Sequence, residues 1–521
     1  MENGEIFINF PPDSVQDADK CSKIEADEPF RKTHSGRQLQ TWTLQFERGN
    51  TMAKHSERIC IIGGGPAGIS AAMYLEKKGY RDYAVYEKLN KVGGKAWSPT
   101  IVAGGEERTY ETGAIMGAKT YFAVHEVEEF GGETHDDGPN MRRMYRDKDG
   151  FVIHPFEIKE DFSVSKTLGL LKLKRQMKKL VKLMNTKYRG YDTYGHIGVA
   201  RGEFYGLSKE VDRPLHRIKG RNPNLKDLAL PFSEFCRLNG VEEVQRIWIG
   251  PYTSFGYGYF DEIPAAYVMK YLDTTTAIEF VNMRLWTWKR GTQSIYEAAN
   301  KKLRNPAILN TEVVKVERPA EGEKGKIRVT IRNAEGEKVE EFDKLIVTIP
   351  LDWFKDFADA REDEKELFSK IIHEKYVDFT AVFDENAGPD ISGYIFDNMT
   401  SERLGHAMVY YHRWEDLGTN CPCPVYALRN HTGDPDVPYD ETIRLMEEDM
   451  KLCGFPVKER LFEQESYYCP HVSPADYADG WYDKLDAMQG KQNTYYAGEI
   501  LSFGDMEDTC ASSRDIVGRF F

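Results

Sequence analysis

The spacing of apolar residues predicts a strand, a turn, a helix and a second strand between residues 58 and 88. The apolar run RICII leads into a glycine-rich turn, a helix follows from about Ala67, and the run YAVYE ends in an acid. Strands that alternate with helices form βαβ units, in which the strands are parallel. We therefore expect an α/β fold that begins near residue 56.

Patterns further along the chain predict four more regions. Residues 165–188 have the apolar period of an amphipathic helix, carried by Leu170, Leu173, Met177, Leu180 and Met184. Residues 311–350 alternate apolar and polar side chains around glycine-containing turns, which predicts a small antiparallel meander. The segment 356–484 mixes strand and helix patterns. Residues 1–55 are polar without a period, and we expect a flexible extension there.

Composition and charge exclude several classes of function for this chain of 521 residues. The formal net charge is −14, and repulsion from phosphates argues against binding to nucleic acid. The eight cysteines are scattered and lack the paired spacing of a zinc site. The sequence has neither a secretory signal nor an apolar run of membrane-spanning length. We therefore expect a cytoplasmic protein without disulfides or a metal site.

The glycines of the first turn fit a dinucleotide-binding fingerprint, G-x-G-x-x-G. The three glycines permit a tight turn, close approach of a pyrophosphate and close packing of helix on strand. The helix that follows directs its amides at that pyrophosphate, and the acid after the second strand can accept the hydroxyls of a ribose. The predicted contacts are Gly63, Gly65, Pro66, Ala67, Gly68, Glu87 and Lys88. The alternative is a glycine turn that serves packing alone.

Three further segments resemble those of amine-oxidase-like flavoproteins. KVGGKAWS (91–98) resembles their double-glycine segment, NTEVVKVE (310–317) the strand that touches adenine, and YYAGEILSFG (495–504) the closing segment. The resemblance implies FAD, because contacts spread along the whole chain suit a long, extended cofactor. The residues that it implies are Gly93, Gly94, Lys95, Trp286, Val314, Gly498 and Glu499.

From about residue 57 to its end the chain resembles the FAD-dependent polyenoic fatty acid isomerases, which convert linoleate to a conjugated isomer. The strings YETGAIMG, FGYGYFDEIPAAYVMKYLD, LWTWKRGTQSIYE and RLGHAMVYYHRW carry this likeness beyond the general flavoprotein signature. It implies a Rossmann-type FAD-binding domain, an amine-oxidase-like mixed-sheet substrate domain and a helical insertion. The implied segments are 56–115, 286–355 and 485–521 for FAD, 116–150, 257–285 and 356–484 for the substrate, and 151–256 for the insertion.

The chemistry of that family requires geometry more than reactive side chains. Hydride removal from the carbon between two double bonds leaves a cation spread over five carbons, and hydride return to another carbon leaves the bonds conjugated. This requires a near-attack position against flavin N5 and exclusion of water. The resemblance therefore implies no catalytic side chain. Two alternatives stay open: a flavin oxidase or desaturase of a lipophilic or amine substrate, and a binding protein without catalysis.

Six residues are implied to touch the fatty acid. Arg143, with its neighbour Arg142, matches the family arginine that meets the carboxylate through a bidentate fork; a surface arginine is the alternative. Phe280 matches an aromatic residue that gates the channel, although its local pattern fits a core residue equally. The glycine-punctuated run that approaches either the ligand or the core contains Phe255, Tyr257 and Phe260.

The predicted helix at 165–188 is strongly basic within an acidic protein. Its cations are Lys166, Lys172, Lys174, Arg175, Lys178, Lys179, Lys182 and Lys187. Such a helix either docks on an anionic membrane, where free fatty acids reside, or presents a solvated face over a packed stripe. The sequence makes no prediction of oligomeric state.

Overall fold

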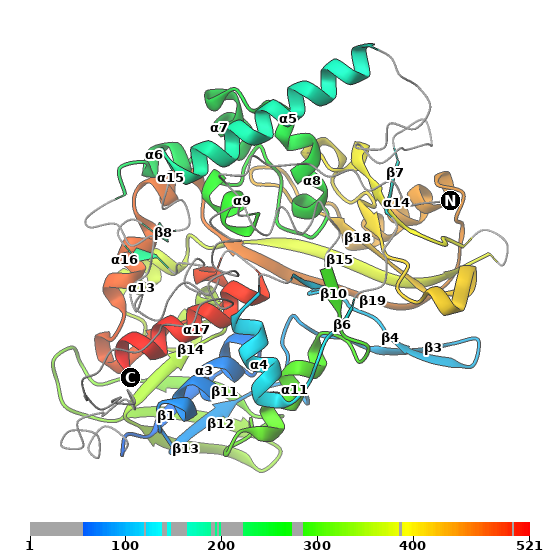
Figure 1. Cartoon of the computed structure of the whole chain (residues 1–521). Helices are drawn as coiled ribbons and strands as arrows, with labels where there is room; N and C mark the ends of the chain where they lie inside the picture. Colours follow the sequence, from blue (N-terminus) through cyan, green and yellow to red (C-terminus); the bar gives the residue numbers. More distant parts are fainter. Residues whose placement is uncertain are drawn as a thin grey trace, which may run out of the picture.

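Four parallel strands form the sheet that carries the glycine-rich turn (Figure 1). The computed structural model orders them β2 (Tyr83–Tyr86), β1 (Ile59–Ile62), β14 (Lys344–Val347) and β20 (Thr494–Tyr496). All four residues of β1 are buried, as expected for the centre of a parallel sheet that is covered on both faces. The predicted α/β unit is confirmed, and strands far apart in the sequence complete its sheet.

The structure describes residues 56–118, 121–137, 143–146, 164–188, 193–194, 197–198, 222–272, 285–384, 388–502 and 505–521. Within these ranges, no helix combines the length and the apolar character that crossing a membrane demands. The predicted extension at 1–55 lies outside the described residues.

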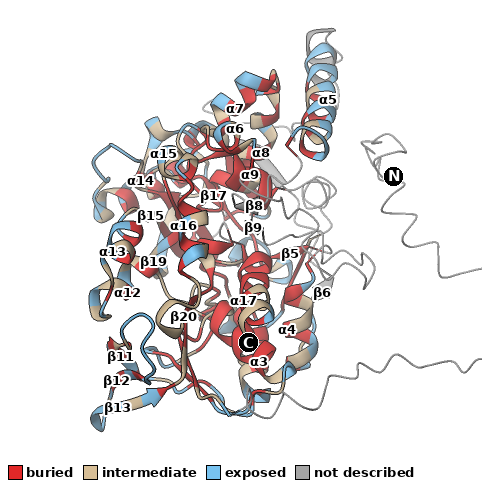
Figure 2. Cartoon of the chain, turned by 90° about the vertical axis from the view of Figure 1, so that its left-hand side faces the viewer, coloured by how far each residue is buried: buried red, intermediate tan, exposed pale blue. Residues whose placement is uncertain are grey.

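Helices from both ends of the chain pack beside the parallel sheet. α3 (Pro66–Lys77) follows β1 and packs against α17 (Met506–Phe520), the last helix of the chain. α4 (Ala123–Gly131) packs against α11 (Gln293–Lys302) and also contacts α17. Figure 2 shows that α3 and α17 are largely buried. The C-terminal helix therefore closes the unit that the first strand begins.

A three-stranded antiparallel meander follows in the sequence, as predicted for residues 311–350. Its strands are β11 (Glu312–Glu317), β12 (Ile327–Asn333) and β13 (Gly336–Phe342). The register of β11 against β12 shifts between Val313 and Lys315, so that Val314 occupies a bulge.

A six-stranded mixed sheet forms the other half of the molecule in Figure 1. Its order is β19 (Val457–His471), β15 (Ile372–Phe383), β18 (Cys423–Leu428), β17 (Val409–Tyr410), β16 (Ser392–Ile395) and β7 (Arg143–Arg146). The pairs are antiparallel except β16 with β7, which is parallel. α14 (Tyr439–Leu452) packs against β18 and β19. The mixed sheet that the resemblance implied is therefore present.

Three smaller sheets and a group of helices complete the described structure. The sheets are β5 (Gly117–Ala118) with β10 (Leu285–Thr287) and β6 (Asp136–Asp137), β3 (Thr100–Ala103) with β4 (Glu106–Thr109), and β8 (Thr193–Tyr194) with β9 (Ile197–Gly198). The remaining α-helices are α5 (Val164–Asn185), α6 (Leu225–Leu228), α7 (Phe232–Asn239), α8 (Gln245–Thr253), α9 (Ala265–Tyr271), α12 (Leu351–Phe357), α13 (Glu362–Phe368), α15 (Pro474–Ala478) and α16 (Trp481–Met488).

The amphipathic helix predicted at 165–188 is α5. Its buried stripe contains Leu173, Met177, Leu180 and Met184, as the apolar period predicted. The stripe packs toward η2 (Glu242–Val244), where Lys172 forms an ion pair of 2.6 Å with Glu243. Leu170 lies at a position whose side chain is outside the description.

Candidate functional site

A cavity of about 890 Å³ lies at the carboxyl ends of the parallel strands. Its wall includes the last residues of β1 and β2, the residues after β14, the end of β19 and the start of α17. Ligands of open parallel sheets bind at this edge, because the loops and helix N-termini that follow the strands meet there. The volume lies at the upper end of the roughly 300–1,000 Å³ range of small-molecule sites.

The β1–α3 turn forms one wall of the cavity through Gly63, Gly65, Pro66 and Ala67. A Cβ at Gly68 would lie 1.8 Å from the carbonyl oxygen of Gly63, so this position packs the helix onto the turn. A Cβ at Gly65 would meet only the backbone of Gly94, its Cα at 3.7 Å and its N at 4.0 Å, and Gly65 itself has φ −76°. A side chain at Gly65 would therefore occupy cavity space, whereas a side chain at Gly68 would clash with the backbone of the turn.

Glu87 stands at the end of β2, on the cavity wall and largely buried. Its Oε2 accepts the amide of Gly64 at 2.7 Å, and its Oε1 accepts the amide of Leu89 at 2.8 Å. Each carboxylate oxygen has a further lone pair, so the group can also accept ligand hydroxyls. The two amides fix its orientation, as a ribose-binding acid requires.

Three lysines line the cavity: Lys88, Lys91 and Lys95. The Nζ of Lys88 lies 5.3 Å from the ring centroid of Trp353, and the Nζ of Lys91 lies 2.8 Å from that of Trp97. Burial lowers the pKa of Lys91 to about 8. Acidic residues also line the cavity, so these lysines supply local positive charge that suits the phosphates of a dinucleotide. The sequence reasoning had missed Lys91.

The double-glycine segment and the closing segment meet at the cavity. Gly93 and Gly94 both have positive φ, at 109° and 50°, which lets the chain turn beside Gly65. Lys95 forms an ion pair of 2.5 Å with Glu499, whose other oxygen accepts the amide of Cys469 at 3.0 Å. Two residues predicted from separate segments are therefore direct partners. Gly498, with φ 111°, places Glu499 at the start of η7 (Glu499–Leu501).

The residue predicted to contact adenine, Val314, is the neighbour of the residue that lines the cavity. Val313 lines the cavity, and its neighbour Val314 stands in the bulge of β11 with a half-buried side chain. The bulge reverses the alternation that a regular strand would have given. A sequence pattern does not reveal such a bulge.

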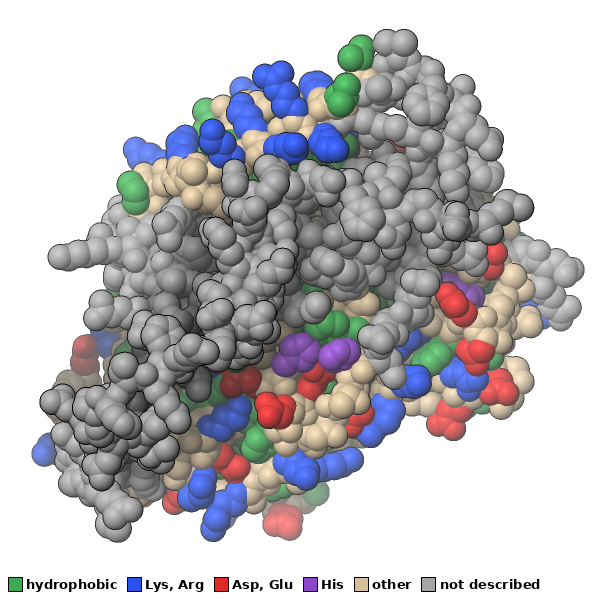
Figure 3. Space-filling view, in the orientation of Figure 1, with side chains coloured by type: hydrophobic (Ala, Val, Ile, Leu, Met, Phe, Trp, Pro, Cys, Tyr) green, Lys and Arg blue, Asp and Glu red, His purple; other side chains and the backbone are tan. Residues whose placement is uncertain are grey.

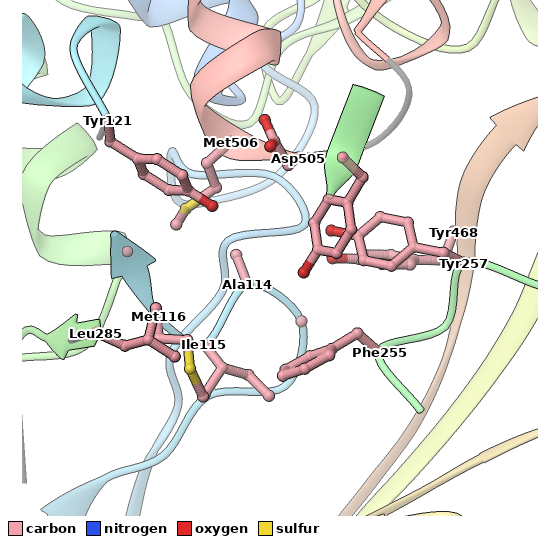
Figure 4. Close-up of a pocket in the computed structure, with 13 residues that line it drawn as sticks. Ala114, Ile115, Met116, Tyr121, Phe255, Tyr257, Leu285, Tyr468, Asp505 and Met506 are labelled. Atoms are coloured by element: carbon pink, nitrogen blue, oxygen red, sulfur yellow. The ribbon is translucent and has the colours of Figure 1, made fainter. Parts of the chain in front are cut away.

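A smaller pocket of about 30 Å³, enough for one water, adjoins the cavity (Figure 4). The two share four lining residues: Ala114, Tyr468, Asp505 and Met506. The small pocket is also lined by the GAIMG segment (113–117) and by Tyr121, Phe255, Tyr257, Tyr271 and Leu285. Figure 4 shows Tyr257, Tyr468 and Phe255 together on one side of it. We call this space the aromatic pocket.

The aromatic pocket has neutral phenols in its wall. The ring centroids of Tyr257 and Tyr271 lie 4.4 Å apart, and those of Tyr257 and Tyr468 lie 5.7 Å apart. Burial raises the pKa of all three tyrosines above its ordinary value. The wall therefore presents aromatic surface and uncharged hydroxyls at neutral pH.

Two of the three predicted aromatic contacts line this pocket, namely Phe255 and Tyr257. Phe260 is not among the residues that line the pocket; it packs edge-on against Phe232, with 4.7 Å between ring centroids, and belongs to the core. Tyr468 and Met506 are pocket residues that sequence reasoning missed. Their signals were the SYYCP stretch at the end of a long strand and the acid-rich GDMED after the closing segment.

The remaining predicted residues lie apart from the two spaces or outside the description. Arg142 and Phe280 lie outside the described residues. Arg143 begins β7 and pairs with Ser392 of β16; only its backbone is described. Trp286, in β10, stacks on His135 with ring centroids 4.0 Å apart and lies behind Gly117 of the aromatic pocket.

A buried ion pair between Arg413 and Glu111 adjoins the segment that lines the aromatic pocket. Arg413 Nε donates to Glu111 Oε2 at 3.1 Å, and Arg413 Nη2 donates to the carbonyl of Trp288 at 2.8 Å. The hydroxyl of Tyr426 donates to the carbonyl of Glu111 at 2.7 Å. Burial raises the pKa of the Glu111 carboxyl, and the adjacent guanidinium opposes that rise. Glu111 stands two residues before Gly113, so the pair positions the pocket wall.

Comparison with known proteins yields one matching family and several similar structures. The model of the flavin containing amine oxidoreductases matches residues 66–507. The crystal structure of a CLA-producing fatty acid isomerase from P. acnes is similar at a TM-score of 0.77, with 42% identity over 90% of this chain and 99% of that one. Wild-type putrescine oxidase bound to putrescine has a TM-score of 0.60 and 14% identity, over 89% and 97% of the two chains. Cyclohexylamine oxidase from Brevibacterium oxydans has a TM-score of 0.57 and 14% identity, over 89% and 98%. The two oxidases show the fold alone.

Proposed function

Since the chain belongs to the family of flavin containing amine oxidoreductases, we propose that it binds FAD and isomerises a free polyunsaturated fatty acid of the linoleate type. The similarity to the CLA-producing fatty acid isomerase, 42% identical over 90% of the chain, favours this substrate class. One observation carries the proposal: the cavity at the strand ends and the aromatic pocket share four lining residues, so the two spaces adjoin. A cofactor along the cavity would present its far end to that pocket.

The residues of the cavity fit FAD in the order of its parts. Val313 and Glu87 would hold the adenosine, with Lys88 beside them. The N-terminus of α3 and the space beside Gly65 would hold the pyrophosphate, because the amides of the first turn of α3 lie at the cavity edge. The Lys95–Glu499 pair follows, and Ala114 and Met506 stand at the far end. When bound, FAD supplies an acceptor and donor of hydride at N5.

The aromatic pocket would position the substrate and keep water out. Neutral tyrosines and Phe255 offer apolar surface for a lipid tail, and their ring faces stabilise positive charge that develops on the substrate. The volume of about 30 Å³ means that a substrate requires side chains there to move aside. Exclusion of water protects a carbocation from capture. These residues would thus orient and shield, without transferring a proton themselves.

We propose that Arg143 anchors the substrate carboxylate, with Arg142 beside it and Phe280 closing the channel. The proposal rests on the family resemblance of these positions. β7, which Arg143 begins, is an edge strand of the mixed sheet that also contributes Tyr468 of the pocket. A bidentate contact at the carboxylate would fix which carbon of the tail reaches the flavin.

The proposed function predicts an isomer without net oxidation. The purified protein, incubated anaerobically with linoleate deuterated at the doubly allylic carbon, should give a conjugated diene of the mass of the labelled substrate. Hydride that leaves and returns within a closed site retains its label, which mass spectrometry of the product measures. A product lighter by two hydrogens, or peroxide formed in air, would identify an oxidase or desaturase instead. Flavin-free protein serves as the control and should be inactive.

We also propose that the protein is cytoplasmic and that it meets membranes through the exposed face of α5. Leu168 and Leu171 are 60% and 58% exposed there. Figure 3 shows Lys and Arg side chains gathered over this helix at the top of the molecule. Exposed leucines beside a row of cations suit the boundary of an anionic bilayer, where the fatty acid would be collected.

Changing Lys174, Lys178 and Lys182 to glutamate should abolish sedimentation with anionic vesicles. These three side chains are exposed and share one side of α5. Each cation near such a surface contributes about 1 kcal/mol, so we expect vesicle affinity to fall at least about 100-fold. The control carries the same charge change at Lys301, Lys302 and Lys324, which are also exposed, and should sediment like the original protein. Equal loss in both variants would refute a role for the helix.

A further inference from the structure

Three side chains able to ligate a metal converge outside the cavity. His125 and Glu128 lie one turn apart on α4, and His135 lies in the segment that follows the helix. One ligand atom from each lies within 4.8 Å of the other two. The Nδ1 of His125 is 2.6 Å from Glu128 Oε2, and the Nδ1 of His135 is 3.2 Å from Glu128 Oε1.

Neighbouring tryptophans hold these ligands in place. Trp288 Nε1 donates to Glu128 Oε1 at 2.6 Å, which fixes the carboxylate and leaves Oε2 toward His125. Trp286 stacks on the ring of His135, with 4.0 Å between centroids and 17° between planes. Metal ligands are held in the same way by hydrogen bonds and packing from outside the coordination sphere. The cluster is thus pre-organised.

The cluster is open to solvent on one side. The side chains of His125 and His135 are 37% and 29% exposed, whereas that of Glu128 is 6% exposed. Figure 3 shows histidine side chains together on the face that it presents. An ion could enter from this side, and the buried carboxylate would offset its charge.

We propose that His125, Glu128 and His135 bind a divalent transition metal, with zinc as the best-suited ion. Two imidazole nitrogens and one carboxylate oxygen are ligands that zinc accepts in a tetrahedral site with an open fourth position. Ligand atoms of such a site lie about 2.0–2.1 Å from the metal and therefore about 3.4 Å from one another. The present spacings of 2.6 and 3.2 Å reach that geometry through small side-chain rotations. The scattered cysteines gave the sequence no metal signal; these ligands come from a helix and the turn after it.

The proposed ion would brace one wall of the aromatic pocket. It would link α4 to the segment before β6, and β6 pairs with β10. Trp286 of β10 lies against Gly117, which lines the pocket. The inference does not depend on the reaction that the protein catalyses, since none of the three ligands lines either space.

Zinc titration of the flavin-loaded protein tests the site. After dialysis against EDTA, ZnCl₂ should bind at one ion per chain in isothermal titration calorimetry. His125→Gln and His135→Gln should each weaken zinc binding at least tenfold, because each removes one of three ligands. Both positions are partly exposed, so the variants should keep the visible flavin spectrum and the circular dichroism of the original protein.

The matched control is His406→Gln. Its Nδ1 lies 2.9 Å from Asp449 and 3.0 Å from the guanidinium of Arg403, which disfavours a bound cation. Zinc affinity should be unchanged there, and ZnCl₂ should raise the melting temperature of this control and of the original protein but not of His135→Gln. Absence of one-to-one binding, or equal affinity in the original protein and both ligand variants, would overturn the proposal.

Discussion

Replacing Gly65 with valine should yield a folded but colourless protein. A Cβ at this position meets only the backbone of Gly94, at 3.7 Å and beyond, so the protein itself has room for that atom. The branched side chain would instead occupy the part of the cavity above the first turn of α3, where a pyrophosphate would approach the backbone. Overpacking of a fitted site costs about 1–3 kcal/mol or more, so affinity for FAD should fall at least about 10- to 100-fold. Flavin content per chain, from the visible spectrum, measures it.

Two further glycine variants separate the cofactor from the fold. Gly518→Ala, in α17, places a Cβ with nothing within 4 Å and should remain yellow and stable. Gly68→Ala would put a Cβ 1.8 Å from the oxygen of Gly63 and should fail to give folded protein at all. A yellow Gly65→Val protein with full flavin content would contradict the assignment of this cavity to FAD.

Local patterns account for the part of the site that the sequence predicted well. The β1–α3–β2 unit lies within 30 residues, and its glycines and Glu87 lie where strand, turn and helix geometry place them. The meander predicted at 311–350 spans β11 to β13, with β14 joining the parallel sheet, and it and the stripe of α5 likewise follow from the alternation and the helical period of neighbouring residues. Such features depend on contacts close in sequence, which a pattern can encode.

Contacts between distant segments account for what the sequence did not predict. Lys95 and Glu499 were each expected near the cofactor, but their ion pair spans 404 positions. One bulged residue decides that Val313 rather than Val314 lines the cavity. The His125 cluster arises because two tryptophans of another segment hold its members. Bulges and long-range partners depend on how whole sheets assemble, which no single stretch records.

Breaking the buried Arg413–Glu111 pair next to the aromatic pocket should destabilise the protein strongly. The pH dependence of the stability should then show which of the two charges remains. The Arg413 and Glu111 side chains are 5% and 2% exposed. Removing one member of a buried pair costs about 3–5 kcal/mol, because the other charge is left without a partner. Glu111→Gln and Arg413→Met should therefore both lower the melting temperature. Thermal unfolding followed by circular dichroism measures the loss.

The two losses should differ in their response to pH. Arg413→Met leaves a carboxyl whose pKa burial raises, so the folded state holds its proton more tightly than the unfolded state. The ionisation of this carboxyl then costs no stability below the unfolded pKa of about 4.3. Above it, the free energy of unfolding falls by about 1.4 kcal/mol per pH unit as pH rises toward the folded pKa. Glu111→Gln leaves a guanidinium, which does not titrate in proteins, so the stability that this variant loses should be independent of pH.

The double variant and a surface pair complete the test. Glu111→Gln combined with Arg413→Met leaves no unpaired charge, and it should be more stable than either single variant at neutral pH. Arg444→Met, which breaks solvent-exposed pairs with Glu441 and Glu448, should change the melting temperature little at acid and at neutral pH. If Arg413→Met lost equal stability at acid and neutral pH, the cost would come from its lost hydrogen bond to Trp288 and lost packing rather than from the stranded carboxylate. The pocket wall that begins at Gly113 would then depend on that carbonyl contact, and flavin retention in Arg413→Met at acid pH would separate the two cases.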